Sequence, residues 1–195
     1  MHRSHKRLQI ASKTMCEQVN KQHAMDVAFY ILAALVAVSG AVFGPRQVKD
    51  IRKKQAYQNT YAIQNVGNDK VLRVLDAGTA DSVPIILYSL HNWECITWQV
   101  IALEDGSCLL KNLYSQKAME ANLNDNTLWQ QTMGGTSRQY WVMEALGEET
   151  FRLRLRDSNL YLTATSSETN SEPKLFSATD DESQLWRLIR QTPIM

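Results

Sequence analysis

The sequence predicts an all-β protein made of three repeats of four short strands, with one apolar helix before them. A motif of the form Gln-x-Trp-x-apolar occurs at Gln139–Met143 and Gln184–Leu188, and in a weakened form at Ile96–Val100. The tryptophans of these motifs lie 43 and 45 residues apart, and a fixed period of roughly 20 to 50 residues is the signature of a repeat fold. Three copies of four short strands fit a closed barrel with pseudo-threefold symmetry better than an open array.

One complete repeat lies in the stretch from Cys108 to Trp141. Apolar and polar residues alternate along it, which is the pattern of half-buried β-strands, and turn residues separate the runs. The four expected strands are Leu109–Leu113, Lys117–Ala121, Leu128–Gln131 and a strand that opens at Gln139 and runs to Met143.

Other short segments also recur at the same spacing as the tryptophan motif. Ile63-Gln64-Asn65 of the first copy matches Leu110-Lys111-Asn112 of the second, and Lys70–Val74 matches Lys117–Ala121. The third copy, Leu153–Ala164, keeps the apolar alternation without the asparagine. The repeat therefore extends well beyond its tryptophan motif.

In period and motif these repeats resemble those of the ricin-B-type lectins, the β-trefoil carbohydrate-binding modules. The resemblance covers residues 61–190, with repeats at about 61–103, 108–146 and 151–190. It implies a β-trefoil fold and a non-catalytic, lectin-like function. The motifs are more specific for the fold than for the ligand.

Residues before the repeats divide into three parts. Residues 1–26 are polar and basic and are expected to form a disordered arm, and residues 45–60 form a basic linker. Between them, residues 27–44 hold an uncharged apolar run of 17 residues, slightly shorter than the roughly 20 that span a bilayer. With its flanking residues this run reaches spanning length, and Gly44-Pro45 would end the helix.

Residues 27–44 therefore predict a single-pass membrane anchor. A cleaved secretory leader is the alternative, because Ser39-Gly40-Ala41 supplies the small residues of a cleavage site. An apolar helix packed against another surface is a third. More lysine and arginine residues follow the apolar run than lie close before it. Because the positively charged flank of a membrane helix usually stays in the cytoplasm, the repeats would be cytoplasmic. A secreted lectin requires the opposite topology.

Charge and cysteine content narrow the function classes. The net charge of +1 argues against nucleic acid as a partner, since phosphate-binding surfaces carry a basic excess. An Asp105-Gly106 hairpin would pair Leu103 with Cys108. Cys95 and Cys108 would then not face each other, and we expect free, buried thiols.

No motif in the sequence points to an enzyme, a cofactor or a metal centre. The four histidines are scattered, and His2-x-x-His5 is a weak metal motif in a basic arm. No phosphate-cradling glycine loop, Ser/His/Asp order or motif-held carboxylate pair occurs.

The resemblance implies one shallow sugar pocket per repeat. In the family, a carboxylate on the second strand accepts hydrogen bonds from sugar hydroxyls, and an aromatic residue on the third strand stacks on the ring. In the three copies the carboxylate position falls at Arg73, Glu120 and Thr163, and the aromatic position at Tyr88, Gln131 and Phe176. The asparagine that often precedes Gln-x-Trp is replaced by Cys95, Arg138 and Ser183. No copy keeps the whole set, so the sites are degenerate.

The second copy is the best candidate for a sugar site. Glu120 is expected to accept hydroxyl hydrogen bonds, Asn122 to lie on the following loop and Arg138 to flank the pocket. Trp129 lies two residues from Gln131, on the same side of an alternating strand, and is expected to supply the stacking ring. Plainer readings remain open: surface charges for Glu120 and Arg138, and packing of the barrel cap for Trp129.

Tyr88 and Phe176 mark secondary sites in the first and third copies, or pack the barrel cap. Trp98, Trp141 and Trp186 are expected in the core, because an aromatic residue repeated by symmetry usually serves packing. The expected partner is a glycan of unknown identity. The alternative is a trefoil scaffold that binds protein partners, as inhibitors of this fold do, through loops such as Ala77–Pro84 or Thr165–Glu172.

Overall fold

The computed structural model describes residues 59–147 and 149–193, which fold into twelve strands and four short 3₁₀ helices. The strands of the first repeat are β1 (Thr60–Asn65), β2 (Val71–Val74), β3 (Ile85–Tyr88) and β4 (Thr97–Ala102). Those of the second are β5 (Cys108–Asn112), β6 (Ala118–Asn122), β7 (Thr127–Gln131) and β8 (Trp141–Ala145). Those of the third are β9 (Thr150–Leu155), β10 (Tyr161–Thr163), β11 (Lys174–Phe176) and β12 (Trp186–Arg190). The 3₁₀ helices are η1 (Leu75–Ala77), η2 (Glu94–Ile96), η3 (Ser137–Gln139) and η4 (Glu182–Gln184).

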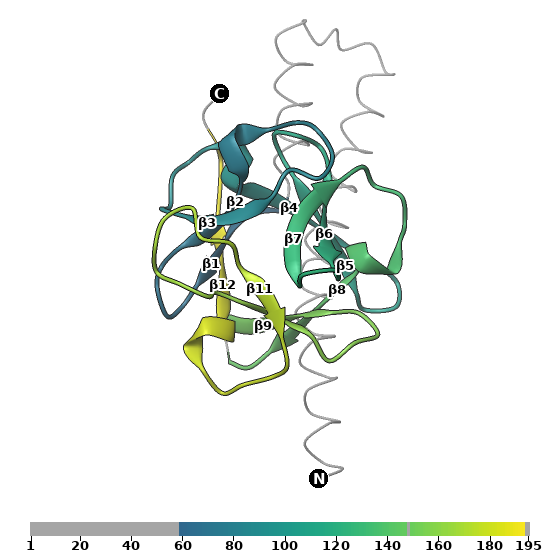
Figure 1. Ribbon diagram of the computed structural model, residues 1–195, viewed down its shortest axis with the longest axis vertical. Coiled ribbons are helices and arrows are strands. Elements are labelled where there is room, and N and C mark those ends of the chain that lie inside the picture. Colours follow the sequence, from purple (N-terminus) through teal and green to yellow (C-terminus); the bar gives the residue numbers. More distant parts are fainter. Residues whose placement is uncertain (1–58, 148, 194–195) are drawn as a thin grey trace, which may run out of the picture.

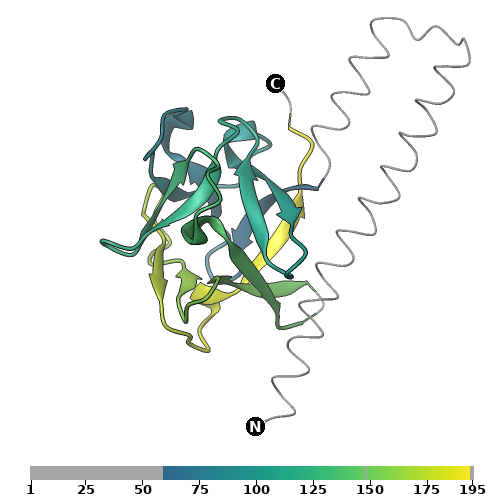
Figure 2. The same cartoon turned by 90° about the vertical axis from the view of Figure 1, so that its right-hand side faces the viewer.

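The first and fourth strands of the three repeats form a closed barrel. Each is antiparallel to its neighbours, in the cyclic order β1, β4, β5, β8, β9, β12 and back to β1. Figures 1 and 2 show the three repeats, in blue, green and yellow, arranged around this ring. The ring leaves none of its six strands with an unpaired edge.

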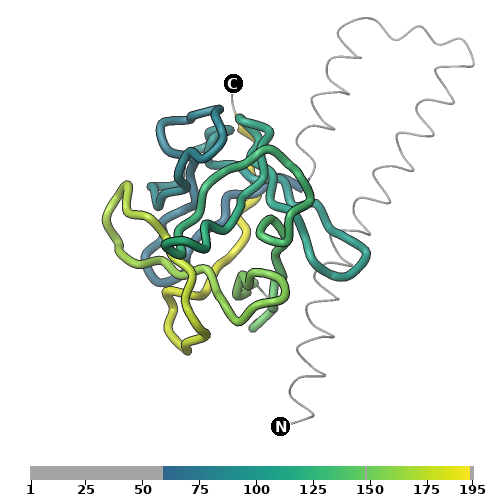
Figure 3. The backbone as a smooth tube through the Cα atoms, turned by 45° about the vertical axis from the view of Figure 1, so that its right-hand side comes forward, coloured from purple at the N-terminus to yellow at the C-terminus, as the bar shows by residue number. Residues whose placement is uncertain are grey.

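The second and third strands of each repeat form a hairpin: β2–β3, β6–β7 and β10–β11. These hairpins are joined by backbone hydrogen bonds from one repeat to another. Figure 3 traces the backbone through the three repeats. The bonds are Ser82 N to Gln130 O at 2.9 Å, Leu87 N to Ser171 O at 2.8 Å and Leu175 N to Asn126 O at 2.8 Å. Each hairpin is therefore held by another repeat as well as by its own.

The three motif tryptophans lie in the core, as the sequence predicts. Each is fully buried in one hydrophobic cluster. Each also donates its indole N–H to a backbone carbonyl of its own repeat: Trp98 to Leu72 at 3.0 Å, Trp141 to Met119 at 3.3 Å, and Trp186 to Leu162 at 3.0 Å. A buried indole satisfied in this way both fills space and orients the adjacent hairpin.

The asparagine landmark joins repeats together. Asn65 lies opposite Trp186 and donates to the carbonyls of Glu182, Ser183 and Leu185 at 3.2, 2.9 and 3.0 Å. Asn112 lies opposite Trp98 and donates to Cys95 and Thr97 at 3.1 and 3.4 Å. In the third repeat Leu155 takes this place opposite Trp141, so that junction lacks the side-chain amide.

The turn between β4 and β5 differs from the expected hairpin. Cys108 pairs with Ala102 instead of Leu103, because the loop is one residue longer and closes with a hydrogen bond from Leu103 N to Ser107 O. Gly106 takes a φ of 83° there, which suits glycine. Cys95 and Cys108 are both buried, as expected, and no disulfide joins them to each other.

The expected apolar helix, residues 27–44, lies outside the described residues, as do the basic arm and most of the linker. Within residues 59–147 and 149–193, no helix has the length and apolar character required to cross a bilayer.

Candidate functional site

The second repeat presents a polar face on the hairpin β6–β7. Residues paired across the hairpin point to the same side, and successive residues point to opposite sides. One side is core and carries Met119, Ala121 and Leu128. The other carries the candidate sugar-binding residues, since Glu120 pairs with Trp129, Ala118 with Gln131 and Asn122 with Thr127.

Glu120 is the centre of this face. Its side chain is almost fully buried, and it is surrounded by donors. Oε1 lies 3.4 Å from Trp129 Nε1 and 3.2 Å from Arg138 Nη2, while Oε2 accepts from Thr136 Oγ1 at 3.2 Å and Gln139 Nε2 at 2.9 Å. A carboxylate can be buried only with such compensation. The two oxygens differ, because the contacts of Oε1 are longer than the shortest contact of Oε2.

Arg138 connects the buried carboxylate to solvent. It lies on η3, which the following Gln139 holds in place through hydrogen bonds to Glu120, Thr132 O and Gly134 N. The side chain of Arg138 is 43% exposed, against 4% for that of Glu120. A ligand that approaches this face therefore meets the guanidinium before it meets the carboxylate.

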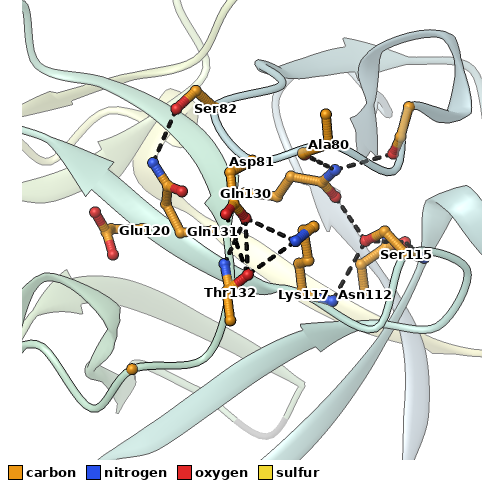
Figure 4. Close-up of polar contacts among 12 residues, drawn as sticks. Ala80, Asp81, Ser82, Asn112, Ser115, Lys117, Glu120, Gln130, Gln131 and Thr132 are labelled. Atoms are coloured by element: carbon orange, nitrogen blue, oxygen red, sulfur yellow. Dashed lines mark hydrogen bonds and ion pairs between the residues drawn. The ribbon is translucent and has the colours of Figure 1, made fainter.

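Asn122 and Gln131 lie on the same face but are used differently. Asn122, expected on the following loop, is instead the last residue of β6. It is buried and holds the β6–β7 turn, since its Oδ1 accepts from Asn124 N at 3.2 Å and its Nδ2 lies 3.4 Å from Thr127 Oγ1. Gln131 donates to Ser82 Oγ at 3.0 Å and so reaches the first repeat (Figure 4). Gln131, at the family's aromatic position, is half-exposed and polar.

In the first repeat, the position that corresponds to Glu120 carries the opposite charge. Arg73 takes the place of Glu120, and its guanidinium carbon lies 4.3 Å from the centroid of the Tyr88 ring and 5.7 Å from that of Trp93. His91 stacks on Trp93 with centroids 4.1 Å apart and an angle of 9° between the rings. Tyr88 also packs against a second small core cluster, so it serves the barrel as well.

The third repeat has an exposed ring and no carboxylate at the corresponding position. Phe176 is 46% exposed and lies opposite Tyr161. Thr163, which corresponds to Glu120, accepts from Gln184 Nε2 at 3.0 Å. Burial, followed by the nearby Glu144 carboxylate, raises the pKa of Tyr161, which donates to Glu144 Oε2 at 3.2 Å. This site offers a stacking surface with few polar groups.

A family model described as ricin-type beta-trefoil lectin domain-like matches residues 47–127 and 94–176. Together these matches cover well over half of the chain. The chain belongs to this family. Among curated proteins, none matches it.

Solved structures share the fold of this chain. A designed threefold-symmetric protein, ThreeFoil, is 25% identical with a TM-score of 0.64, over 67% of this chain and 98% of that chain. The ricin B-like lectin of Macrolepiota procera, in complex with lactose, is 19% identical with a TM-score of 0.56, over 67% and 94% of the two chains. The C-half of the earthworm R-type lectin, in complex with GalNAc, is 15% identical with a TM-score of 0.55, over 68% and 99%. The last two likenesses show the shared fold alone.

Within this trefoil, the structure brings together Glu120, Trp129 and Arg138, and leaves Tyr88 and Phe176 in separate repeats. Sequence reasoning missed Thr136 and Gln139 as partners of Glu120. Gln139 carried a signal, because it is the glutamine of the repeated motif, whereas Thr136 carried none. Among the described residues, no group of three or more histidine, cysteine, aspartate or glutamate residues is placed to hold a metal ion.

Proposed function

We propose that this ricin-type trefoil is a non-catalytic carbohydrate-binding domain whose working site is the outer face of the second repeat. The observation that carries the proposal is the convergence of a carboxylate, an indole and a solvent-facing guanidinium at Glu120, Trp129 and Arg138. A sugar ring has a polar rim and an apolar face, and these groups answer both needs. Two similar structures hold GalNAc and lactose, which supports a glycan as the class of ligand.

The geometry suggests how a sugar is held. Arg138 donates to ring or hydroxyl oxygens from its exposed side. Oε1 of Glu120 accepts from a hydroxyl, in exchange for its 3.4 Å contact with Trp129, because that contact is the longest that the carboxylate makes. The freed indole, only half-buried, then lies against the apolar face of the ring. Oε2 keeps its bonds to Thr136 and Gln139 and holds the carboxylate in place.

The proposal assigns Glu120 no catalytic role. Glycoside hydrolysis ordinarily needs a pair of carboxyl groups on either side of the scissile bond. Every side-chain contact of the Glu120 carboxylate in the described part of the chain is a donor instead. The site therefore supports binding.

We propose that residues 27–44 anchor the chain in a membrane as a single-pass helix, with a secreted form after leader cleavage as the alternative. Residues 45–60 then link this segment to the trefoil, residues 61–190. Proteolysis of intact and detergent-opened vesicles, followed by sequencing of the mature N-terminus, tests both the topology and the cleavage.

The test of the sugar site is a glycan array probed with the purified full-length chain and with Trp129→Ala and Glu120→Gln. We expect the wild-type protein to bind neutral glycans and both variants to lose at least about tenfold in affinity, equivalent to about 1.4 kcal/mol. Tyr114→Ala is the matched control, since it also removes an exposed ring from the second repeat, at a position outside the candidate sites. Thermal denaturation shows that each variant is folded.

Two results would reject parts of the proposal. Unchanged binding in both Trp129→Ala and Glu120→Gln removes the second repeat as the site. A folded wild-type chain that binds no glycan rejects carbohydrate binding.

The second result would favour a protein-binding scaffold. The observation in favour of this alternative is the order of the exposed 77–84 loop. Gln130 Nε2 donates to the carbonyls of Gly78 and Ala80 at 2.9 and 2.8 Å, and Asp81 contacts Lys117 Nζ at 2.7 Å (Figure 4). A loop held in one shape binds a partner with little loss of entropy.

A further inference from the structure

We propose that the first repeat is a second binding site, selective for an acidic sugar, meaning a pyranose that carries a carboxylate or a sulfate. This inference rests on the proposed carbohydrate function and adds to it a different site and ligand class. The site consists of Arg73, Tyr88, His91 and Trp93.

The first argument is the unpaired cation at Arg73. Within residues 59–147 and 149–193, no hydrogen bond and no ion pair joins Arg73 to another described residue, and its Nε is buried without an acceptor. Five arginines in the same part of the chain form ion pairs, namely Arg138, Arg152, Arg154, Arg156 and Arg187. Since Nε is buried, an external anion would bind the two terminal nitrogens of the Arg73 guanidinium, which have no hydrogen-bond acceptor among the described residues.

The second argument is the aromatic surface beside that cation. Trp93 is 42% exposed and rests on His91 with nearly parallel rings. The Tyr88 centroid lies 5.9 Å from that of His91 and 6.2 Å from that of Trp93. A pyranose can therefore lie against the exposed indole while its acidic group reaches Arg73.

The sequence explains why these rings gather only in the first repeat. In the other two repeats the motif glutamine accepts a backbone N–H from the preceding loop, Gln139 from Gly134 at 3.1 Å and Gln184 from Thr179 at 2.9 Å. In the first repeat Ile96 replaces that glutamine and cannot do so. The loop before Ile96 instead carries the stacked rings of His91 and Trp93, and Asn92 Nδ2 donates to Thr192 O at 2.9 Å.

The chemistry of Arg73 selects an acidic ligand. A planar guanidinium forms paired, charge-assisted hydrogen bonds with a carboxylate or a sulfate. The ring of Tyr88 beneath it orients the cation. In the second repeat a buried carboxylate stands at the corresponding position and would repel the same ligand. One domain thereby offers two sites of different preference, one for neutral sugars and one for acidic sugars.

The experiment is titration of the purified full-length chain, followed by indole fluorescence and calorimetry. The probes are glucuronic acid, galactose 6-sulfate and, as the neutral reference, galactose. We expect at least one acidic probe to bind about tenfold more tightly than galactose. We also expect that affinity to fall as sodium chloride rises from about 50 to about 500 mM. The acidic probe that binds best identifies the anionic group.

Three variants place the site. Arg73→Gln and Trp93→Ala should each weaken the acidic probe by about tenfold or more, while Arg73→Lys keeps the charge and retains part of the affinity. Arg156→Gln is the matched control and should bind as the wild type does. Its guanidinium also lies over a tyrosine, 4.0 Å from the Tyr140 centroid, but it is paired with Asp105 at 2.8 Å.

Unchanged acidic-probe affinity in Arg73→Gln overturns the inference, as does equal affinity for galactose and both acidic probes. Competition by an acidic peptide as strong as that by the monosaccharide also overturns it, in favour of a protein ligand. The second-repeat site is measured separately, by comparing the binding of neutral glycans to the wild type and to Glu120→Gln on the array. Failure of the acidic-sugar site therefore does not reject the neutral-sugar site, and the reverse also holds.

Discussion

Gln139 donates a hydrogen bond of 2.9 Å from Nε2 to Oε2 of Glu120, and both side chains are buried. Gln139 belongs to the motif that orients the barrel tryptophan, and Glu120 is the residue proposed to bind sugar. The candidate site is thus attached directly to the element that builds the fold. Substitutions at Glu120 should consequently affect stability as well as binding.

Glu120→Ala should lower the free energy of unfolding by about 2–3 kcal/mol, because it leaves one Nε2 hydrogen of Gln139 and the hydroxyl of Thr136 without their acceptor. Arg138→Ala should cost less than about 1 kcal/mol, since its side chain is 43% exposed and screened by water. Urea denaturation of both variants measures the difference. Equal losses would mean that the ion pair, and not the buried hydrogen bonds, stabilises this corner.

Gln184→Ala should destabilise the third repeat by about 2–3 kcal/mol. Gln184 is fully buried, donates to Thr163 Oγ1 and Ser177 O, and accepts from Thr179 N. Gln131→Ala is the control, because its single side-chain bond joins Ser82 at an exposed position, and it should cost less than about 0.5 kcal/mol. A loss for Gln184→Ala no larger than the control's would contradict the structural role of the motif glutamine.

Gly106→Ala should cost about 1 kcal/mol. Its φ of 83° is unfavourable for a side chain, although a Cβ there would meet no atom within 4 Å. Gly134→Ala serves as the comparison, because the nearest atom to its Cβ would be Thr132 O at 3.8 Å and its φ is not positive. Thermal melts of the two variants separate backbone strain from crowding, and matching melting temperatures would exclude strain.

Acid should destabilise the fold through its turn carboxylates. The Lys117 ammonium lowers the pKa of Asp81, and the Ser107 and Thr127 hydroxyls lower those of Asp105 and Asp125. A lowered pKa in the folded state stabilises the protein above the ordinary pKa, and this stabilisation is lost as pH falls through the folded pKa. The urea midpoint should therefore fall as pH drops below about 4.

The acid effect is tested by combining Asp81→Asn, Asp105→Asn and Asp125→Asn in one chain. We expect this variant to be less stable than the wild type near neutral pH and to lose less on acidification. Parallel pH profiles of the two proteins would show that other groups cause the acid sensitivity.

Local pattern was enough to find the fold. Trp98, Trp141 and Trp186 could be placed in the core from spacing alone, because a symmetric fold repeats its packing residues. Turn details were less accessible. Gln139 lies in η3 and not in a strand, and Cys108 pairs with Ala102, since loop length depends on backbone hydrogen bonds that a residue pattern does not reveal.

The candidate sites were predicted only in part. Alternation along β7 placed Trp129 and Gln131 on one face, and pairing across the hairpin puts Trp129 opposite Glu120 and Gln131 opposite Ala118. The partner Thr136 comes from a loop with no periodic signal. Equally, no pattern in the sequence shows that Arg73 lacks a carboxylate partner, because that depends on the positions of all the neighbouring side chains in the folded structure.

The strand ring has a kinetic consequence. Its closing seam joins β1 to β12, and Thr60 Oγ1 donates to Gln191 O across 131 residues of sequence. Contacts of such long range form late, because the entropy of the intervening chain must be lost first. We therefore expect slow folding, with β1 and β12 as open edges in the last intermediate. Those edges are where two incompletely folded chains would first associate.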